Sequence, residues 1–228
     1  MPNPKPIKIS VEGHGKVSGL LLKPRGALAC CVLAHGAGAG MTHPFMEAIA
    51  LALAARGMAT LRYQFPYMEK KSRRPDAPAV AQAAVRAAVN EAARLAPGLA
   101  LIAGGKSFGG RMTSQSQAAS PLPGVRALAF LGFPLHPAGK PSDARGEHLA
   151  AVRVPMLFLQ GTRDKLAELS LLRPPCNGLR RATLHEIEDA DHSFHVPART
   201  GRKDAEVIAE LADVLAEWAA RLTPPARL

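Results

Sequence analysis

The chain has 228 residues, of which 47% are hydrophobic, and its formal net charge is +11 at pH 7. This length suits one sizeable domain, and the apolar content excludes a disordered or collagen-like chain. The basic residues are spread along the whole chain and aromatic residues make up only 4% of it. Because platforms for stacking bases are therefore scarce, we do not expect a nucleic-acid partner.

The location of the protein is predicted from its apolar runs and its cysteines. The apolar stretches are shorter than the roughly 20 residues that cross a bilayer, and MPNPKPIKIS at the start lacks the apolar region of a signal peptide. Cys30 and Cys31 are neighbours in a strand-like run, so they point to opposite faces and are poorly placed to pair, and Cys176 stands alone. Reduced thiols are typical of a reducing compartment. We expect a cytoplasmic protein without a membrane partner.

Apolar runs rich in branched residues alternate with helical stretches along the chain. The expected strands are 7–13 and 17–24, which form a hairpin, followed by 28–36, 59–65, 99–105, 125–132, 154–161 and 182–188. The expected helices are 44–56, 78–95, 107–119 and 204–222. The last of these is amphipathic, with an apolar face through Val207, Ile208, Leu211, Leu215 and Trp218.

This alternation predicts an α/β fold, with a mostly parallel sheet of about eight strands that begins with an antiparallel hairpin and carries helices on both faces. Neither a repeat nor a linker divides the chain, so we expect one domain over residues 1–228. The loop-like segments 66–78 and 134–150 are expected to lie over one edge and to roof a pocket. They are too short for a lid domain, which predicts little or no cap and a shallow site.

A glycine-rich segment follows the strand 99–105. Residues 105–109 read Gly-Lys-Ser-Phe-Gly and fit the pattern G-x-S-x-G between a strand and a helix. In that context, small neighbours allow a sharp turn that exposes the hydroxyl of Ser107 at the carboxyl end of the sheet. The segment matches neither of the common phosphate-binding glycine patterns. Ser107 is therefore our candidate nucleophile; the alternative is a passive serine in a tight turn.

A serine nucleophile needs a base and an acid that orients the base. Asp164 follows the strand 154–161 and His192 follows the strand 182–188. Because the carboxyl ends of parallel strands meet at one edge of a sheet, we expect both to lie near Ser107. Two alternatives stay open, namely that Asp164 caps a helix and that His195 is the base.

The oxyanion of an acyl-transfer reaction is held by backbone N–H groups. We expect one from Phe108, which follows the serine, and one from Ala37 in the loop His35-Gly36-Ala37-Gly38, with Gly38 as the second choice. His35 itself is expected to be structural. Tyr63, Tyr67 and Phe133 are candidates for the apolar walls of the substrate pocket, although core packing is an equal alternative for each.

The motifs HGAG, GKSFGG, GTRD and DADHSF cover almost the whole chain in order. Together they resemble the α/β-hydrolase superfamily, and within it the small dienelactone-hydrolase-like branch. The segments RYQFPYMEKKSRRPD and GFPLHPAGKP are most similar to bacterial hydrolases that resemble the testis-expressed hydrolase-like protein. The chain departs from true dienelactone hydrolases, which use a cysteine where this chain has Ser107, and from lipases and esterases, whose loop reads HGGG.

The residues and the resemblance predict a serine hydrolase that cleaves a small ester or thioester through an acyl-enzyme. The expected partner is a small acyl substrate, neither a metal nor an organic cofactor is implied, and a homodimer is left open. The alternative from another class is a non-catalytic interaction protein that has kept the fold.

Overall fold

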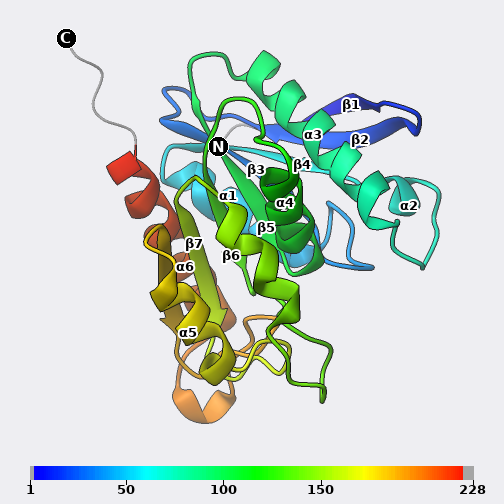
Figure 1. Cartoon of the computed structure of the whole chain (residues 1–228). Coiled ribbons are helices and arrows are strands. Elements are labelled where there is room, and N and C mark those ends of the chain that lie inside the picture. Colours follow the sequence, from blue (N-terminus) through cyan, green and yellow to red (C-terminus); the bar gives the residue numbers. More distant parts are fainter. Residues whose placement is uncertain (1–2, 223–228) are drawn as a thin grey trace.

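A single eight-stranded sheet runs through the molecule in the computed structural model, which describes residues 3–222 (Figure 1). The order of the strands across the sheet is β1-β2-β4-β3-β5-β6-β7-β8. Their bounds are β1 (Lys5–Val11), β2 (Gly15–Leu22), β3 (Ala29–Ala34), β4 (Met58–Tyr63), β5 (Ala100–Lys106), β6 (Val125–Leu131), β7 (Met156–Gly161) and β8 (Ala182–Ile187).

The first two strands form the expected antiparallel hairpin, and β2 also pairs antiparallel with β4. All the other pairs are parallel. The sheet is therefore mostly parallel, and the carboxyl ends of β3, β5, β7 and β8 share one edge. The loops that leave this edge carry the candidate catalytic residues.

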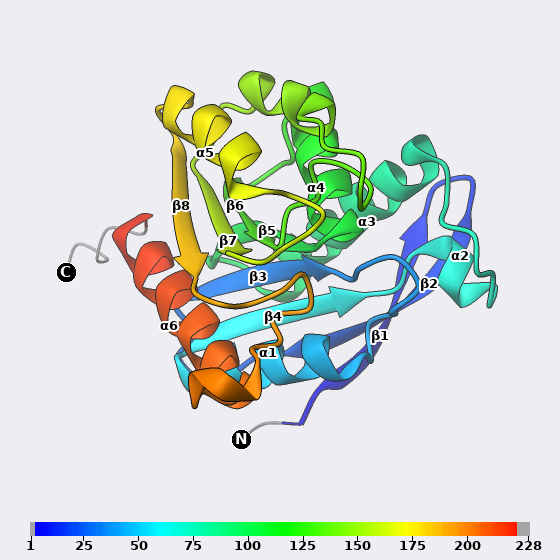
Figure 2. The same cartoon turned by 90° about the horizontal axis from the view of Figure 1, so that it is seen from below.

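Helices cover both faces of the sheet (Figure 2). One face packs against α1 (Pro44–Ala55) and α6 (Asp204–Leu222), and the other packs against α3 (Pro78–Leu95), α4 (Phe108–Ala119) and α5 (Leu169–Gly178). Three short helices complete the described chain: α2 (Pro66–Glu69), η1 (Ala144–Ala151) and η2 (Ala198–Thr200). The arrangement is the predicted α/β fold in one domain.

The core lies in two layers on either side of the sheet, and β3 shows why. Every residue of β3 is buried, because helices cover both faces of a parallel sheet. Cys30 belongs to the layer beneath α3 and α4, whereas the adjacent Cys31 belongs to the layer beneath α1 and α6. Burial raises the pKa of both thiols, to about 12 for Cys30. The two side chains point to opposite faces, as predicted.

Helix α6 begins and ends where the amphipathic pattern predicts. Val207, Leu211, Leu215 and Trp218 are buried against the sheet, and Ile208 is half-buried beside them. Helix α5 was not predicted, because Pro174 and Pro175 lie inside it and each removes a backbone donor. Leu172 and Cys176 of α5 are buried in the core, and this packing outweighs the cost of the prolines.

Candidate active site

The sharp turn after β5 places Ser107 between the strand and α4. Ser107 has φ 49° and ψ −116°, an unusual conformation for a residue with a side chain. A Cβ atom on Gly104 would overlap the carbonyl oxygen of Ala129 in β6. A Cβ atom on Gly109 would lie 2.6 Å from the Cβ and carbonyl oxygen of Ala34 at the end of β3. The glycines are there because neighbouring backbone passes too close for side chains.

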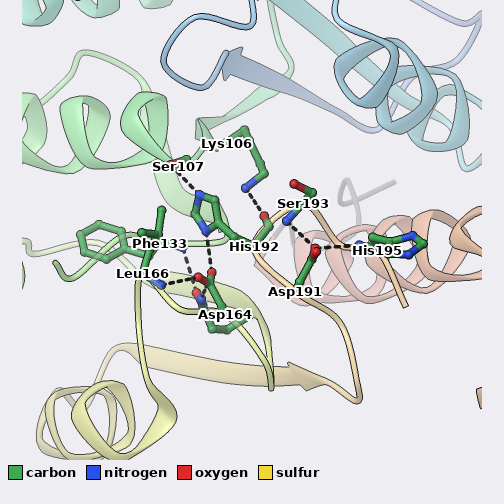
Figure 3. Close-up of polar contacts among 10 residues, drawn as sticks. Lys106, Ser107, Phe133, Asp164, Leu166, Asp191, His192, Ser193 and His195 are labelled. Carbon is green, nitrogen blue, oxygen red and sulfur yellow. Dashed lines mark hydrogen bonds and ion pairs between the residues drawn. The ribbon is translucent and has the colours of Figure 1, made fainter. Parts of the chain in front are cut away.

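Three side chains from three loops meet at this edge of the sheet (Figure 3). The Oγ atom of Ser107 lies 2.8 Å from Nε2 of His192, and Nδ1 of His192 lies 2.6 Å from Oδ2 of Asp164. An ionised carboxylate only accepts hydrogen bonds, so this geometry assigns the proton to Nδ1 and leaves Nε2 free to accept from the serine hydroxyl. The structure thus brings together the three residues that the sequence singled out.

Asp164 is buried and is held by two donors besides His192. The amide nitrogen of Gln160 donates to Oδ2 at 2.6 Å, and the backbone N–H of Leu166 donates to Oδ1 at 2.8 Å. Gln160 is itself fixed, because its Oε1 accepts from the backbone N–H of Phe133 at 2.8 Å. Glu168, not Asp164, stands at the N-cap of α5. Asp164 therefore orients His192 and does not cap a helix.

Gln160 is a member of this site that sequence reasoning missed. It lies at the end of β7, where the rest of the strand is apolar, and it is completely buried. A buried amide requires hydrogen-bond partners. A single glutamine in an otherwise apolar strand could therefore have predicted a hydrogen-bonded network at the end of that strand.

His195, the alternative base, does not face the serine. Its Nδ1 lies 2.9 Å from Oδ2 of Asp204 at the start of α6, and its side chain is 64% exposed. The hydrogen bond to Asp204 raises the pKa of His195. His195 therefore links the loop to α6, and His192 alone of the two contacts Ser107.

His35 is a buried structural residue, as expected. Its Nδ1 contacts the carbonyl oxygen of Gly36 at 2.7 Å, and its Nε2 accepts from the backbone N–H of Phe65 at 3.2 Å. Burial lowers the pKa of His35 to about 4, so the ring is neutral at pH 7. It fixes the start of the loop that contains Ala37, one of the two proposed oxyanion donors.

A cavity of about 330 Å³ opens over Ser107 and His192. Its walls are mainly apolar, and Lys106 is a cationic side chain among them. The apolar lining residues are Ala37, Ala39, Phe45, Met46 and Leu166. Ala37, a predicted oxyanion donor, therefore lines the same cavity as Ser107, and Phe108, the other predicted donor, is the first residue of α4.

Of the two alternatives left open for Tyr63, Tyr67 and Phe133, the structure shows core packing and not a role as cavity walls. Tyr63, Tyr67 and Phe133 do not line the cavity; they are 1%, 3% and 0% exposed and pack in the core. Phe133 contacts the rings of Phe130 and Phe158. The structure also corrects the predicted roof, because neither 66–78 nor 134–150 contributes a lining residue. The segment after β3 and the first turn of α1 supply most of the lining residues instead.

A second serine–histidine contact lies elsewhere in the molecule. The Oγ atom of Ser114 in α4 is 2.7 Å from Nε2 of His148 in η1, and Ser114 also donates to the carbonyl oxygen of Arg111. Both residues lie outside the cavity over Ser107. This contact ties η1 to α4. Another cavity, of about 300 Å³, lies between η1 and α5 and contains neither Ser114 nor His148.

Within residues 3–222, no three His, Cys, Asp or Glu side chains are grouped in a way that could hold a metal ion. None of the helices in this part of the chain is long and apolar enough to span a membrane.

Known structures share this fold over nearly their whole length. A dienelactone hydrolase from Anabaena variabilis is 22% identical, with 98% of this chain and 99% of that chain aligned at a TM-score of 0.79. A serine hydrolase without a lid from Xanthomonas campestris is 20% identical, with coverages of 100% and 99% and a TM-score of 0.73. An esterase domain from Rhodothermus marinus is 17% identical, with coverages of 96% and 99% and a TM-score of 0.71.

At these identities the structural likeness establishes the fold. The family is established by a sequence model described as the alpha/beta hydrolase domain, which matches residues 27–220. That match includes the strand–turn–helix around Ser107 and the loops of Asp164 and His192. The chain therefore belongs to the alpha/beta hydrolase domain family.

Proposed function

We propose that this protein is a serine hydrolase that cleaves a small carboxylic ester or thioester through an acyl-enzyme. One observation carries the proposal: the unbroken hydrogen-bonded series Ser107–His192–Asp164 at the floor of an open, mainly apolar cavity. In this series each group is within reach of the next, as nucleophilic catalysis by a hydroxyl requires.

The reaction follows from the contacts. As Oγ of Ser107 attacks the substrate carbonyl carbon, Nε2 of His192 takes the hydroxyl proton, and Asp164 stabilises the resulting imidazolium. The tetrahedral intermediate collapses, the bond to the leaving oxygen or sulfur breaks, and His192 returns the proton to that atom. A water molecule, deprotonated by His192, then attacks the acyl-enzyme, and the acid leaves as Ser107 regains its proton.

The oxyanion is assigned to the N–H groups of Phe108 and Ala37. Phe108 begins α4, and the first N–H groups of a helix have no acceptor within it and face developing negative charge favourably. In the loop after β3, the N–H of Gly38 donates to the hydroxyl of Tyr67 at 2.9 Å. That bond commits Gly38 elsewhere and favours Ala37, which lines the cavity.

The substrate class is inferred from the cavity. About 330 Å³ with apolar walls suits a short acyl chain. The similarity in fold to proteins described as a dienelactone hydrolase and as an esterase domain supports ester chemistry. From the segments 62–76 and 132–141 we also infer a relationship to bacterial hydrolases that resemble the testis-expressed hydrolase-like protein. Three unpaired cysteines favour a cytoplasmic location.

A fluorophosphonate probe tests this proposal directly, since it labels an activated serine. The wild-type protein should be labelled at neutral pH and should hydrolyse short p-nitrophenyl esters or thioesters. The Ser107→Ala variant should lose labelling and at least about 1000-fold in turnover, because the nucleophile is removed. Absence of labelling in the folded wild type, or equal turnover by both proteins, would contradict catalysis and favour a binding role.

Chain-length preference is a separate test. Hydrolysis of long-chain triglycerides faster than short p-nitrophenyl esters would contradict the small-substrate assignment while leaving the serine mechanism intact.

A further inference from the structure

Lys106 is a charged residue that the proposed mechanism does not use. It stands at the first x of G-x-S-x-G, a position for which the motif specifies no side chain. It is only 9% exposed, although lysine is almost never buried unless it is paired. Among the described residues no carboxylate lies within ion-pair distance of its ammonium.

The ammonium of Lys106 has another partner, the backbone of the proposed base. Nζ donates to the carbonyl oxygen of His192 at 2.5 Å, which links two segments 86 residues apart (Figure 3). Two aromatic rings, stacked on each other, lie near the ammonium: the centroid of Phe194 is 5.4 Å from Nζ and that of Phe45 is 6.0 Å away. Such rings stabilise a cation with their faces.

Gly132 at the end of β6 makes room for this link. A Cβ atom there would lie 3.0 Å from Nζ of Lys106 and 3.5 Å from both Nδ1 and the carbonyl oxygen of His192. The ammonium and the imidazole therefore both lie close to the position that a side chain on Gly132 would occupy, near enough to each other to interact electrostatically.

We propose that Lys106 is a positioning residue for His192: it holds the histidine loop against the end of β5, and its positive charge sets the pH range in which the imidazole is free to act as a base. The inference rests on the proposed serine-hydrolase function. Two adjacent residues of one turn thereby serve the same histidine, since Ser107 contacts its ring and Lys106 contacts its backbone.

The charge of Lys106 is retained at neutral pH. Burial lowers its pKa to about 8, with Asp164 and Asp191 opposing the shift. The titratable groups near the two residues are Asp164 from the loop after β7, Asp191 from the histidine loop and His43, which lines the cavity ahead of α1.

Two variants separate the hydrogen bond from the charge. Lys106→Met removes both, and Lys106→Gln keeps an N–H donor on a side chain one bond shorter. With a short neutral ester, Lys106→Met should lower kcat at least about 10-fold with KM changed less than about twofold, because small misplacements of a base are costly. Lys106→Gln should recover part of kcat. In both variants the acidic limb of the pH profile should move to higher pH, since the nearby positive charge is lost.

The control is Lys16→Met, which removes the same charge from an exposed position in β2 and should match the wild type. Circular dichroism and thermal melting show whether each variant folds; if Lys106→Met does not, the comparison of Lys106→Gln with the wild type decides. Unchanged kcat and an unchanged acidic limb would overturn the proposal. A second result would also overturn it: Lys106→Met loses kcat, Lys106→Gln recovers none of it, and the acidic limb of the pH profile does not move. Lost packing alone would then explain the fall in kcat.

A readout without turnover distinguishes this inference from the proposed function. The ring resonances of His192, followed by NMR, should titrate at higher pH in Lys106→Met than in the wild type. If the wild type neither labels nor turns over, the proposed function fails, and this titration still tests the influence of Lys106. Equal titration midpoints in a folded variant would overturn it.

Discussion

Ser107 has a strained backbone, and the residues around it explain how the strain is maintained. Its φ of 49° lies in a region that residues with side chains rarely occupy. The surrounding glycines let β5 and α4 approach their neighbours closely, and the serine N–H donates to the carbonyl oxygen of Leu131 at 3.1 Å. Packing on all sides thus fixes a conformation that an isolated peptide would avoid.

Gln160 provides a test at the scale of a single residue. Gln160→Ala removes a donor to Asp164 and leaves the N–H of Phe133 without its acceptor. We expect kcat to fall about 10- to 100-fold because His192 loses its firm orientation, and stability to fall by about 1–3 kcal/mol. Steady-state kinetics and urea unfolding measure the two effects.

The matched control is Gln117→Ala. Gln117 is a buried glutamine whose Oε1 accepts a hydrogen bond from the backbone N–H of Leu122 at 2.8 Å, and it does not line the cavity. The Gln117→Ala variant should lose about as much stability as Gln160→Ala but should keep the kcat of the wild type. Equal kcat losses in both variants would mean that Gln160 has no special relation to Asp164.

At the scale of the element, α4 lies directly on the end of β3. Gly109 in the first turn of α4 has no side chain, and the contact distances leave no space for one. This close approach brings the N-terminus of α4 to the loop that contains Ala37. The two proposed oxyanion donors are therefore positioned by one helix–strand contact.

Gly109→Ala tests this contact. Its Cβ would lie 2.6 Å from Cβ and the carbonyl oxygen of Ala34 and from the carbonyl oxygen of His35. Because backbone atoms cannot move aside cheaply, we expect a loss of about 1–3 kcal/mol in stability and a fall in kcat. In Gly178→Ala, at the end of α5, the new Cβ would meet no atom within 4 Å, so stability should be unchanged or higher. Thermal melting and ester kinetics compare the stability and kcat of the two variants. Equal stability and equal kcat in Gly109→Ala and Gly178→Ala would contradict the steric explanation.

At the scale of the whole molecule, the protonation of His35 couples folding to pH. His35 is fully buried, and burial lowers its pKa to about 4 from an ordinary value of 6.5. Between these values the unfolded chain binds more protons than the folded protein, so folding free energy is lost as pH falls. The contribution of neutral His35 to the stability of the folded protein is fully present above pH 6.5.

We therefore expect wild-type stability to fall by about 3 kcal/mol between pH 7 and pH 4 from this residue. Urea unfolding across this range measures the fall. His35→Asn should be less stable at pH 7 but should have a shallower dependence on pH, because the titrating ring is gone. The same slope in both proteins would show that other groups cause the acid sensitivity.

The order of strands and helices, the mostly parallel sheet and the choice of Ser107, Asp164 and His192 followed from the sequence. Hydrophobic periodicity is a local property, and the carboxyl ends of parallel strands share one edge by geometry. The amphipathic face of α6 was predictable for the same reason. Helix α5 was not, because its prolines oppose helix formation locally and only packing against the sheet compensates for them.

Tertiary structure alone decided which residues line the cavity. Tyr63 ends β4, and Tyr67 and Phe133 follow β4 and β6 at the same edge of the sheet. Their rings are nevertheless buried in the core, whereas Phe45 and Leu166 line the cavity. The roles of Gln160 and Lys106 also depend on contacts across many residues. Local patterns determine which elements form and which loops meet, but the direction in which each side chain points is settled by the packing of all of them together.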